Sequence, residues 1–336
     1  MRYVGMDVHW RQTTICILDE NGRRVKLMTV RGPWEKVLSK LRRIEGRWQA
    51  CFEASCGYGW LYERLKTMAE KVTVAHPGQL RLIFRSKRKN DRVDAEKLAK
   101  LLYLDEVPAV YVPSAPVRSW RAMIEHRQRL IRERVRIKNQ LRALLRTHGI
   151  VAAKGLWARR GKQWLGRLHF AMELDALQRD ILTERLDAVE AMIRRVEQAL
   201  ARIGERHPAI CMLREIPGVG IRTAEAVVAY VDDPHRFGRI REAGSYFGLV
   251  PCQDQSAGTN RLGHITRQGP ATVRKLLTEA AWQAIRRSPR VRAYFERIRQ
   301  DNPERRKIAV VATAHYLLRV MLAMWRTGEV WRDEAA

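Results

Sequence analysis

The sequence predicts an α/β domain, then a helical hairpin, then a mainly helical third domain, and three patterns lead to this fold class. Within residues 1–112, short runs rich in β-branched residues alternate with segments of helical spacing. Within 113–207, apolar residues recur every three or four positions in two long runs. Within 208–336, helical patterns surround a polar, glycine-rich stretch. The length of 336 residues favours two or three domains, each large enough to bury its own core.

Three short strands open the first domain and are predicted to form a meander. Residues 2–9, 12–18 and 24–30 are β-rich, and the turn sequence "DENGR" separates the last two. The rest of the domain is predicted to contain strands at 47–54 and 71–77, an extended piece at 108–113, and helices at 34–44, 58–70 and 91–104. This order favours a mixed sheet covered by helices on both faces.

Two long helical runs joined by a connector with three glycines predict an antiparallel coiled-coil hairpin in the second domain. The first arm is strongly basic: residues 118–167 hold fifteen Lys and Arg against two Glu, whereas 173–205 hold five Arg against eight acids. Such a run can be a solvated face, but this contrast favours an arm that binds a polyanion. Three of its residues are candidate nucleic-acid ligands: Arg132, Arg136 and Lys138.

The third domain begins with "LREIPGVGIRTAEAVVAYV", in which Gly218 and Gly220 lie between two apolar helical runs. This pattern resembles a helix-hairpin-helix, whose backbone N–H groups hold a phosphate; the alternative is a tight turn that requires glycine. The stretch 248–269 is predicted to be a turn-rich loop, because it is too polar for a core element. Helices are predicted at about 270–287, 290–300 and 306–326.

The formal net charge of +28, with a pI near 10.7, points to a polyanionic partner. Nucleic acid is favoured over an anionic membrane surface. A basic segment at 81–100 adds four candidate ligands: Lys87, Arg88, Lys89 and Arg92. We expect a soluble cytoplasmic protein without a membrane partner, because no uncharged apolar run reaches about 18 residues and no signal-peptide pattern is present.

Five scattered cysteines form no C-x-x-C pair, which disfavours a disulfide framework and a structural zinc site. All five are predicted to be small, reduced core residues: Cys16, Cys51, Cys56, Cys211 and Cys252.

Four acidic residues are candidates for a metal site in this basic chain. Asp7 ends the first predicted strand, Glu53 ends the fourth, and Asp91 and Asp94 lie one helical turn apart. Each has a structural alternative, such as complementing a helix dipole. Their order nevertheless matches a ribonuclease-H-like layout, in which two Mg²⁺ ions stabilise both oxygens of an in-line phosphoryl displacement. His9 is either an acid–base group or simply solvent-facing.

Ser256 in the polar stretch is a second chemical candidate, since an exposed loop hydroxyl can attack a phosphate. Most loop serines have no such role, and Ser245 and Thr259 are equally plausible on the residues alone. Three nearby arginines are candidates for holding the phosphate: Arg261, Arg267 and Arg274.

The motifs together resemble the insertion sequence 110 family of DEDD transposases, which includes the 1111 group. The similar segments, in chain order, are "GMDVH", "FEASCGYG", "NDRVDAEKLA", "IPGVGIRTA" and "SYFGLVPCQDQSAGTNRLGHITRQGPATVRKLLTEAAW". They span nearly the whole chain in the family's order and spacing. Each is weakly specific alone, but the combination is highly specific.

This resemblance implies a domain similar to the Holliday-junction resolvase RuvC, followed by a coiled coil and a transposase domain. It implies that Asp7, Glu53, Asp91 and Asp94 bind Mg²⁺ and that Ser256 is the nucleophile. It further implies a recombinase guided by a structured noncoding bridge RNA that pairs with donor and target DNA. Such enzymes are tetramers whose active sites combine carboxylates of one subunit with the serine of another, here at the nucleoid of a bacterial or archaeal cell.

The predicted function is therefore DNA strand cleavage and rejoining during movement of an insertion sequence. One rival is a metal-dependent junction nuclease that uses water and needs only the four acids. Another, from outside catalysis, is a nucleic-acid scaffold whose acids are structural. Metalloprotease, P-loop and dinucleotide-binding motifs are absent from the sequence, which disfavours those classes.

Overall fold

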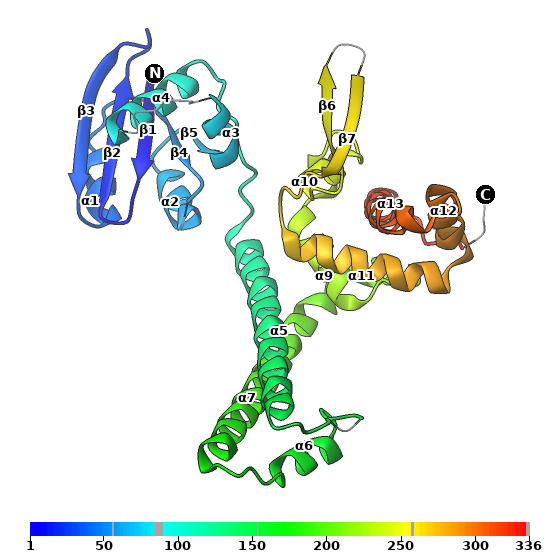
Figure 1. The fold of residues 1–336 in the computed structure, drawn as a ribbon. Helices are drawn as coiled ribbons and strands as arrows, with labels where there is room; N and C mark the ends of the chain where they lie inside the picture. Colours follow the sequence, from blue (N-terminus) through cyan, green and yellow to red (C-terminus); the bar gives the residue numbers. More distant parts are fainter. Residues whose placement is uncertain (56, 84–89, 153, 257–258, 334–336) are drawn as a thin grey trace. The chain divides into compact units, whose positions relative to one another are not determined.

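The computed structural model describes the chain except residues 56, 84–89, 153, 257–258 and 334–336, and the side chains of 256–260 are also outside the description. The described chain divides into two compact units, Met1–Arg118 and Ser119–Ala336 (Figure 1). The division into three domains stays a prediction.

The first unit is built on a five-stranded mixed sheet in the order β3-β2-β1-β4-β5. The strands are β1 (Arg2–Val8), β2 (Gln12–Leu18), β3 (Arg24–Arg31), β4 (Trp48–Glu53) and β5 (Lys71–Ala75). β1, β2 and β3 pair antiparallel, whereas β4 runs parallel to both β1 and β5. The predicted meander and mixed sheet are confirmed.

Helices cover both faces of this sheet, as predicted. On one face, α1 (Trp34–Leu41) and α2 (Tyr58–Leu65) close a core around Met6 and Phe52. On the other face lie α3 (Pro77–Ile83), which the sequence did not predict, and α4 (Asp91–Tyr103). A Cβ on Gly5 would lie 2.2 Å from the Ala99 nitrogen, so only glycine lets the α4 backbone rest directly on β1.

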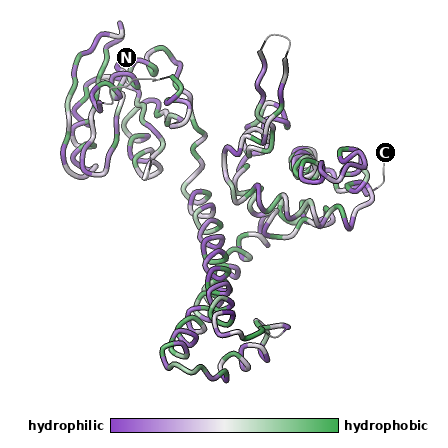
Figure 2. Tube along the Cα trace, viewed as in Figure 1, coloured by the Kyte–Doolittle hydropathy of each residue, from purple (hydrophilic) through white to green (hydrophobic). Residues whose placement is uncertain are grey.

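Two long helices follow: α5 (Ala115–Thr147), whose first residues belong to the first unit, and α7 (Glu173–Gly204), with α6 (Arg159–Gly166) between them. Their buried leucines and isoleucines form one cluster that includes Ile137 and Leu186. The helices run antiparallel, because Arg127 pairs with Glu197 near one end and His148 with Asp175 near the other. Hydrophilic and hydrophobic residues alternate along both helices (Figure 2). The coiled-coil assignment stays a prediction.

The remaining helices of this unit pack around one large core. They are α8 (Pro208–Leu213), α9 (Ile221–Val231), α10 (Glu242–Tyr246), α11 (Ala271–Arg287), α12 (Pro289–Arg299) and α13 (Arg306–Thr327), with short 3₁₀ turns at Pro234–Arg236 and Pro303–Arg305. The segment Pro303–Thr327, which contains α13, is long and apolar enough to cross a membrane. However, Leu317, Leu318 and Met321 are fully buried in this core, as in a core helix of a soluble domain.

The polar stretch 248–269 is not the predicted loop. It forms an antiparallel hairpin of β6 (Pro251–Ser256) and β7 (Thr259–Ile265). The side chains that are described in both strands are almost all exposed, so the pairing depends on backbone hydrogen bonds rather than on a buried face. The prediction was wrong because it required an apolar side for a strand.

The cysteines only partly follow the prediction. Cys16 and Cys51 are buried, and burial raises the pKa of Cys16 to about 11 and that of Cys51 to about 12, so both thiols are inert at neutral pH. Cys211 and Cys252 are exposed instead, which corrects the prediction that all five lie in a core. Cys56 lies outside the described residues.

Candidate functional site

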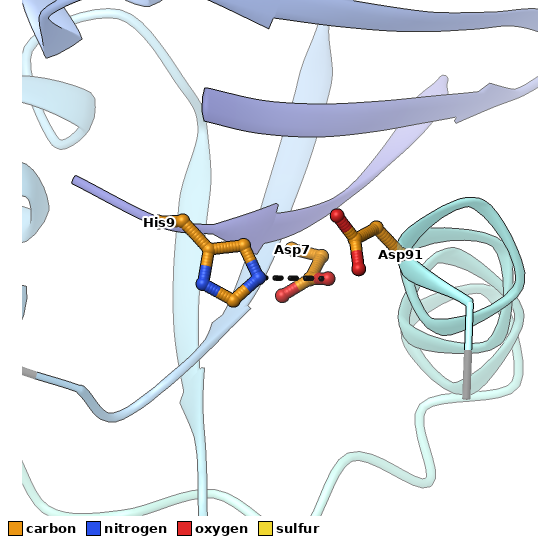
Figure 3. Close-up of side chains that lie close together, drawn as sticks. All are labelled: Asp7, His9 and Asp91. Atoms are coloured by element: carbon orange, nitrogen blue, oxygen red, sulfur yellow. Dashed lines mark ion pairs between the residues drawn. The ribbon is translucent and has the colours of Figure 1, made fainter. Parts of the chain in front are cut away.

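Asp7, His9 and Asp91 converge at the carboxyl end of β1, the central strand of the first unit's sheet (Figure 3). One ligand atom from each lies within 4.8 Å of the others, and His9 Nε2 is 3.4 Å from Asp7 Oδ2. The Asp7 side chain is only 17 % exposed, whereas His9 is 54 % exposed. The site is therefore open on the His9 side.

Strand alternation and a helix cap explain this convergence. Gly5 faces α4, so Asp7, two residues further along β1, faces the same side. The Asn90 side chain accepts a hydrogen bond from the Arg92 backbone N–H and begins α4 at Asp91. Gln12 on the neighbouring strand donates from Nε2 to Asp91 Oδ2 at 3.0 Å and fixes that carboxylate.

Glu53 lies at the same end of the sheet by register. β1 and β4 pair in parallel, with Met6 opposite Phe52, so Asp7 and Glu53 follow as the next pair of positions. Phe52 points into the core beneath α1 and α2, and alternation therefore directs Glu53 to the opposite face, which is also that of Asp7. Glu53 is outside the close trio but shares its end of the sheet.

The acids of this site repel one another. The pKa of Asp7 is raised, first by burial and then by the nearby charges of Asp91 and Asp94, while His9 opposes the shift. A cation at this end of the sheet would relieve the repulsion. Carboxylate oxygens are the ligands that hard cations such as Mg²⁺ prefer, so the donor set fits that ion.

Ser256 is the last residue of β6 and pairs with Thr259, the first residue of β7. It belongs to the second unit, whereas the four acids belong to the first. The alternative hydroxyl Ser245 is exposed on α10. Ser256 and Thr259 thus lie at the tip of an exposed hairpin, and Ser245 lies at its base.

The three arginines near this hairpin differ in their surroundings. Arg261 on β7 and Arg267 after it are exposed. Arg274 donates hydrogen bonds to the carbonyl oxygens of Phe247, Gln268 and Gly269. Arg274 therefore ties the base of the hairpin to α11, a structural role beside the predicted one.

The two glycines of the predicted helix-hairpin-helix, Gly218 and Gly220, have different surroundings. A Cβ on Gly218 would lie 2.4 Å from the Ala284 nitrogen, so this glycine allows close packing on α11. Gly220 precedes α9 and has open space at its Cβ position. It lines a cavity of about 600 Å³, and four basic residues share the lining: Arg127, Arg134, Arg222 and Lys275. Three of these cations pair with acids: Arg127 with Glu197, Arg222 with Glu225, and Lys275 with Glu279, which also lines the cavity. The first N–H groups of α9 and Arg134 are therefore the groups that suit a phosphate there.

The other basic residues that were predicted to bind nucleic acid differ in whether they are exposed or already paired. Arg92, Arg132 and Arg136 are exposed. The Lys138 ammonium lies 3.2 Å from Glu190 and over the Trp157 ring, so it is engaged within the helical hairpin. Lys87, Arg88 and Lys89 lie outside the described residues.

Two polar residues of these sites were not predicted from the sequence. Gln12 could have been found from the alternation of β2, which places it on the face of Cys16 and Leu18. Glu225 is an acid within the apolar run "AEAVVAYV" of α9. It is 1 % exposed and lies 2.7 Å from Arg222, and burial raises its pKa to about 7.

Comparison with known proteins gives two matching family profiles. The profile described as "Transposase IS116/IS110/IS902 family" matches residues 211–296. A second transposase profile, whose name joins the DEDD motif to IS110, matches residues 4–150.

Individual proteins are also similar over most of the chain. The "Probable family 20 transposase" of Pseudomonas aeruginosa is 30 % identical over 232 residues, which is 67 % of this chain and 68 % of that protein. The "Transposase for insertion sequence element IS1111A" of Coxiella burnetii is 27 % identical, over 85 % of this chain and 78 % of the relative. The "Putative transposase y4pF/y4sB" of Sinorhizobium fredii is 28 % identical, over 83 % and 73 %.

Proposed function

Because this chain belongs to the IS116/IS110/IS902 family of transposases, and is thus an enzyme of DNA transposition, we propose that it cuts and rejoins DNA strands with Ser256 as nucleophile. The carboxylates of the first unit would act with it. The observation that carries this proposal is the convergence of Asp7 and Asp91, with Glu53 in register beside them.

The proposed fold of the first unit is ribonuclease-H-like and similar to RuvC. The strand order β3-β2-β1-β4-β5, with an antiparallel meander and two parallel strands, supports this assignment. So does α4, which rests on β1 and brings its first turn to the strand's carboxyl end. The three sequence segments that supply acids thereby meet at one end of the sheet.

Asp7, Glu53, Asp91 and Asp94 would hold two Mg²⁺ ions. Bound there, Mg²⁺ would neutralise the charge that develops on the phosphoryl oxygens. Gln12 would keep the Asp91 carboxylate oriented through its 3.0 Å hydrogen bond, and His9 would do the same for Asp7. The charges of Asp91 and Asp94, which help to raise the pKa of Asp7 after the larger effect of burial, support a site that gathers acids.

In the proposed reaction, the Ser256 hydroxyl oxygen attacks a DNA phosphorus atom. A phosphoserine ester forms, the bond from phosphorus to the 3′ oxygen breaks, and the serine proton ends on the released 3′ hydroxyl. The reverse reaction, with a 3′ hydroxyl of another strand, frees the serine and joins the new partners. No oxidant or high-energy cofactor is needed, because one phosphodiester replaces another.

The resemblance supports three further parts of the proposal. A structured bridge RNA would pair with donor and target DNA, and the exposed arginines Arg92, Arg132 and Arg136 would contact the nucleic-acid backbones. The protein would act as a tetramer at the nucleoid. By the same resemblance, one subunit's carboxylates would combine with another subunit's serine.

The test is covalent trapping of DNA on the protein. The Ser256→Ala variant should form no adduct with a cleavable DNA substrate yet bind RNA normally, while the matched Ser245→Ala variant should form adducts as the wild type does. Strand cleavage that persists in Ser256→Ala without an adduct would favour the junction nuclease. Unchanged recombination in Asp91→Asn/Asp94→Asn would favour the scaffold.

A further inference from the structure

Three tryptophans line a pocket beside the carboxylate site, all within the first unit. Its cavity volume is about 580 Å³, and Trp10, Trp34 and Trp60 form its aromatic part. Such a volume falls within the range of small-ligand pockets, roughly 300–1,000 Å³. The proposed transposition chemistry leaves this pocket without a role.

The three indoles form a stepped aromatic surface. The Trp34 ring centroid is 5.4 Å from that of Trp10 at an interplanar angle of 71°, and 5.7 Å from that of Trp60 at 32°. Trp34 is buried, whereas Trp10 is 76 % exposed and Trp60 is 39 % exposed. Three indoles in contact through Trp34, two of them open to solvent, offer aromatic surface to a planar ligand.

The pocket is firmly built and is connected to the metal-site candidates. Trp34 donates its Nε1–H to the backbone oxygen of His9 at 3.1 Å. Gly57 has a φ of +80°, and a Cβ there would lie 2.5 Å from the Trp34 ring, so the backbone itself supports that ring. The His9 side chain faces Asp7, so His9 links the two sites at this end of β1, although the tryptophans lie on the face of α1 and α2 and the acids on the face of α4.

The polar groups around the rings suit a nucleotide. The Arg64 guanidinium lies 5.4 Å from the Trp60 ring centroid, and Arg11 lines the pocket, so cations are available for an adjoining phosphate. Glu35 also lines it and can accept a hydrogen bond from the exocyclic amino group of a base. Aromatic faces stack on unpaired bases with little regard to sequence.

We propose that this pocket binds one unpaired nucleobase of a single strand next to the carboxylate site. The base stacks on the exposed face of one indole, Trp10 or Trp60, while the other ring closes the pocket beside it, and its phosphate contacts Arg11 or Arg64. This holds a splayed strand in position for the carboxylates. The inference needs only the DNA substrate of the family, so it stands even if the Ser256 assignment fails.

The experiment compares the full-length wild type with Trp10→Ala, Trp60→Ala and the control Val25→Ala, which removes an exposed apolar side chain from β3 of the same unit. The probe is a short oligonucleotide with a central 2-aminopurine, in DNA and RNA forms, and a matching strand that is abasic at its central positions. Affinity is measured by anisotropy and stacking by quenching of the 2-aminopurine emission.

We expect the wild type and Val25→Ala to quench the probe and to bind it more tightly than the abasic strand. Trp10→Ala and Trp60→Ala should lower the affinity for base-containing strands about five-fold or more. Their affinity for the abasic strand should stay within about two-fold of the wild-type value. Trp10→Phe should recover most of the loss, which separates stacking from misfolding. The DNA and RNA arms show which strand is preferred.

Equal affinity of the wild type for base-containing and abasic strands would overturn the proposal. An equal loss of affinity for base-containing and abasic strands in Trp10→Ala would also overturn it. The substitution would then act on the fold or on backbone contacts rather than on base stacking. A change of oligomeric mass in Trp10→Ala, with base preference intact, would assign the surface to a subunit contact instead.

Discussion

Among single residues, two buried or partly buried carboxylates have shifted pKa values, and their responses to pH and to metal can be tested. Asp7 and Glu225 both have raised pKa values, and burial is the main cause in each. Asp7 also faces two like charges at an open site, whereas Glu225 lies against Arg222 inside a core. We propose that the first helps to hold a cation, whereas the second pairs with Arg222 within α9.

The Asp7→Asn substitution should separate stability from metal binding. It removes a half-buried charge that Asp91 and Asp94 repel, so the metal-free protein should melt at a higher temperature near neutral pH. The same variant should lose most of the stabilisation that Mg²⁺ gives. Thermal melts with and without Mg²⁺ measure both effects. The exposed Glu20→Gln variant is the control and should match the wild type.

The Glu225→Gln substitution should change stability with pH. A raised folded pKa means that the neutral carboxyl favours the folded state below the unfolded value near 4.5, and that this benefit is lost as pH rises through about 7. Relative to wild type, the variant should therefore gain on the order of 2 kcal/mol between pH 5 and pH 8. Urea unfolding at both pH values measures the difference. If the free energies of unfolding of variant and wild type differ by the same amount at both, the pKa of Glu225 is not raised in the folded protein.

Among the helices and strands, the contact of α4 with β1 brings the acids together. Gly5 allows it, since any Cβ would meet the backbone of α4 at Ala95 and Ala99. The side chains of the trio come from three different elements or loops. Their geometry is therefore set by how these elements pack.

Gly5→Ala should disrupt that contact. Overpacking against backbone atoms should destabilise the first unit by about 3 kcal/mol or more and abolish Mg²⁺ binding. Gly166→Ala on α6, where a Cβ meets nothing within 4 Å, should be neutral or slightly stabilising. Calorimetry of both variants with and without Mg²⁺ tests this, and a stable, metal-binding Gly5→Ala protein would contradict it.

The exposed arginines of α5 should contribute to binding through charge alone. The double variant Arg132→Ala/Arg136→Ala should reduce the slope of log affinity against log salt by about 2 for duplex nucleic acid. Lys138→Ala should leave the slope nearly unchanged, because its ammonium already pairs with Glu190. Titrations at several salt concentrations compare the variants, and identical slopes would remove α5 from the binding surface.

Much of this fold follows from local sequence patterns. The five strands of the sheet carry alternating or continuous apolar runs, and the long helices keep a regular apolar period, so both are predictable. β6 and β7 are not, because a ribbon exposed on both faces needs no apolar pattern. α3 is only seven residues long and begins with Pro77 and Gly78, which hides its period.

The candidate site was predictable as a set of residue types but not as a geometry. The order of the acids along the chain suggested a shared site. The proximity of His9 to Asp7 and the hydrogen bond from Gln12 to Asp91 depend on strand register and on the packing of α4. No local sequence pattern encodes either of these. The tryptophan pocket likewise joins residues from three separate segments.

The whole molecule contains two units that carry different chemistry. The first supplies acids that suit a cation, and the second supplies a serine at the tip of an exposed hairpin. The chain's formal net charge of +28 suits a polyanionic substrate. The central claim is that these two sets of residues act in one reaction.

Peptide mapping by mass spectrometry, after trapping DNA on the protein with Mg²⁺ present, tests this claim most directly. The account predicts a nucleotide linked to the peptide that contains Ser256 in the wild type, and none in the Asp91→Asn/Asp94→Asn protein. A nucleotide on another residue, or an undiminished Ser256 adduct in the doubly substituted protein, would contradict it.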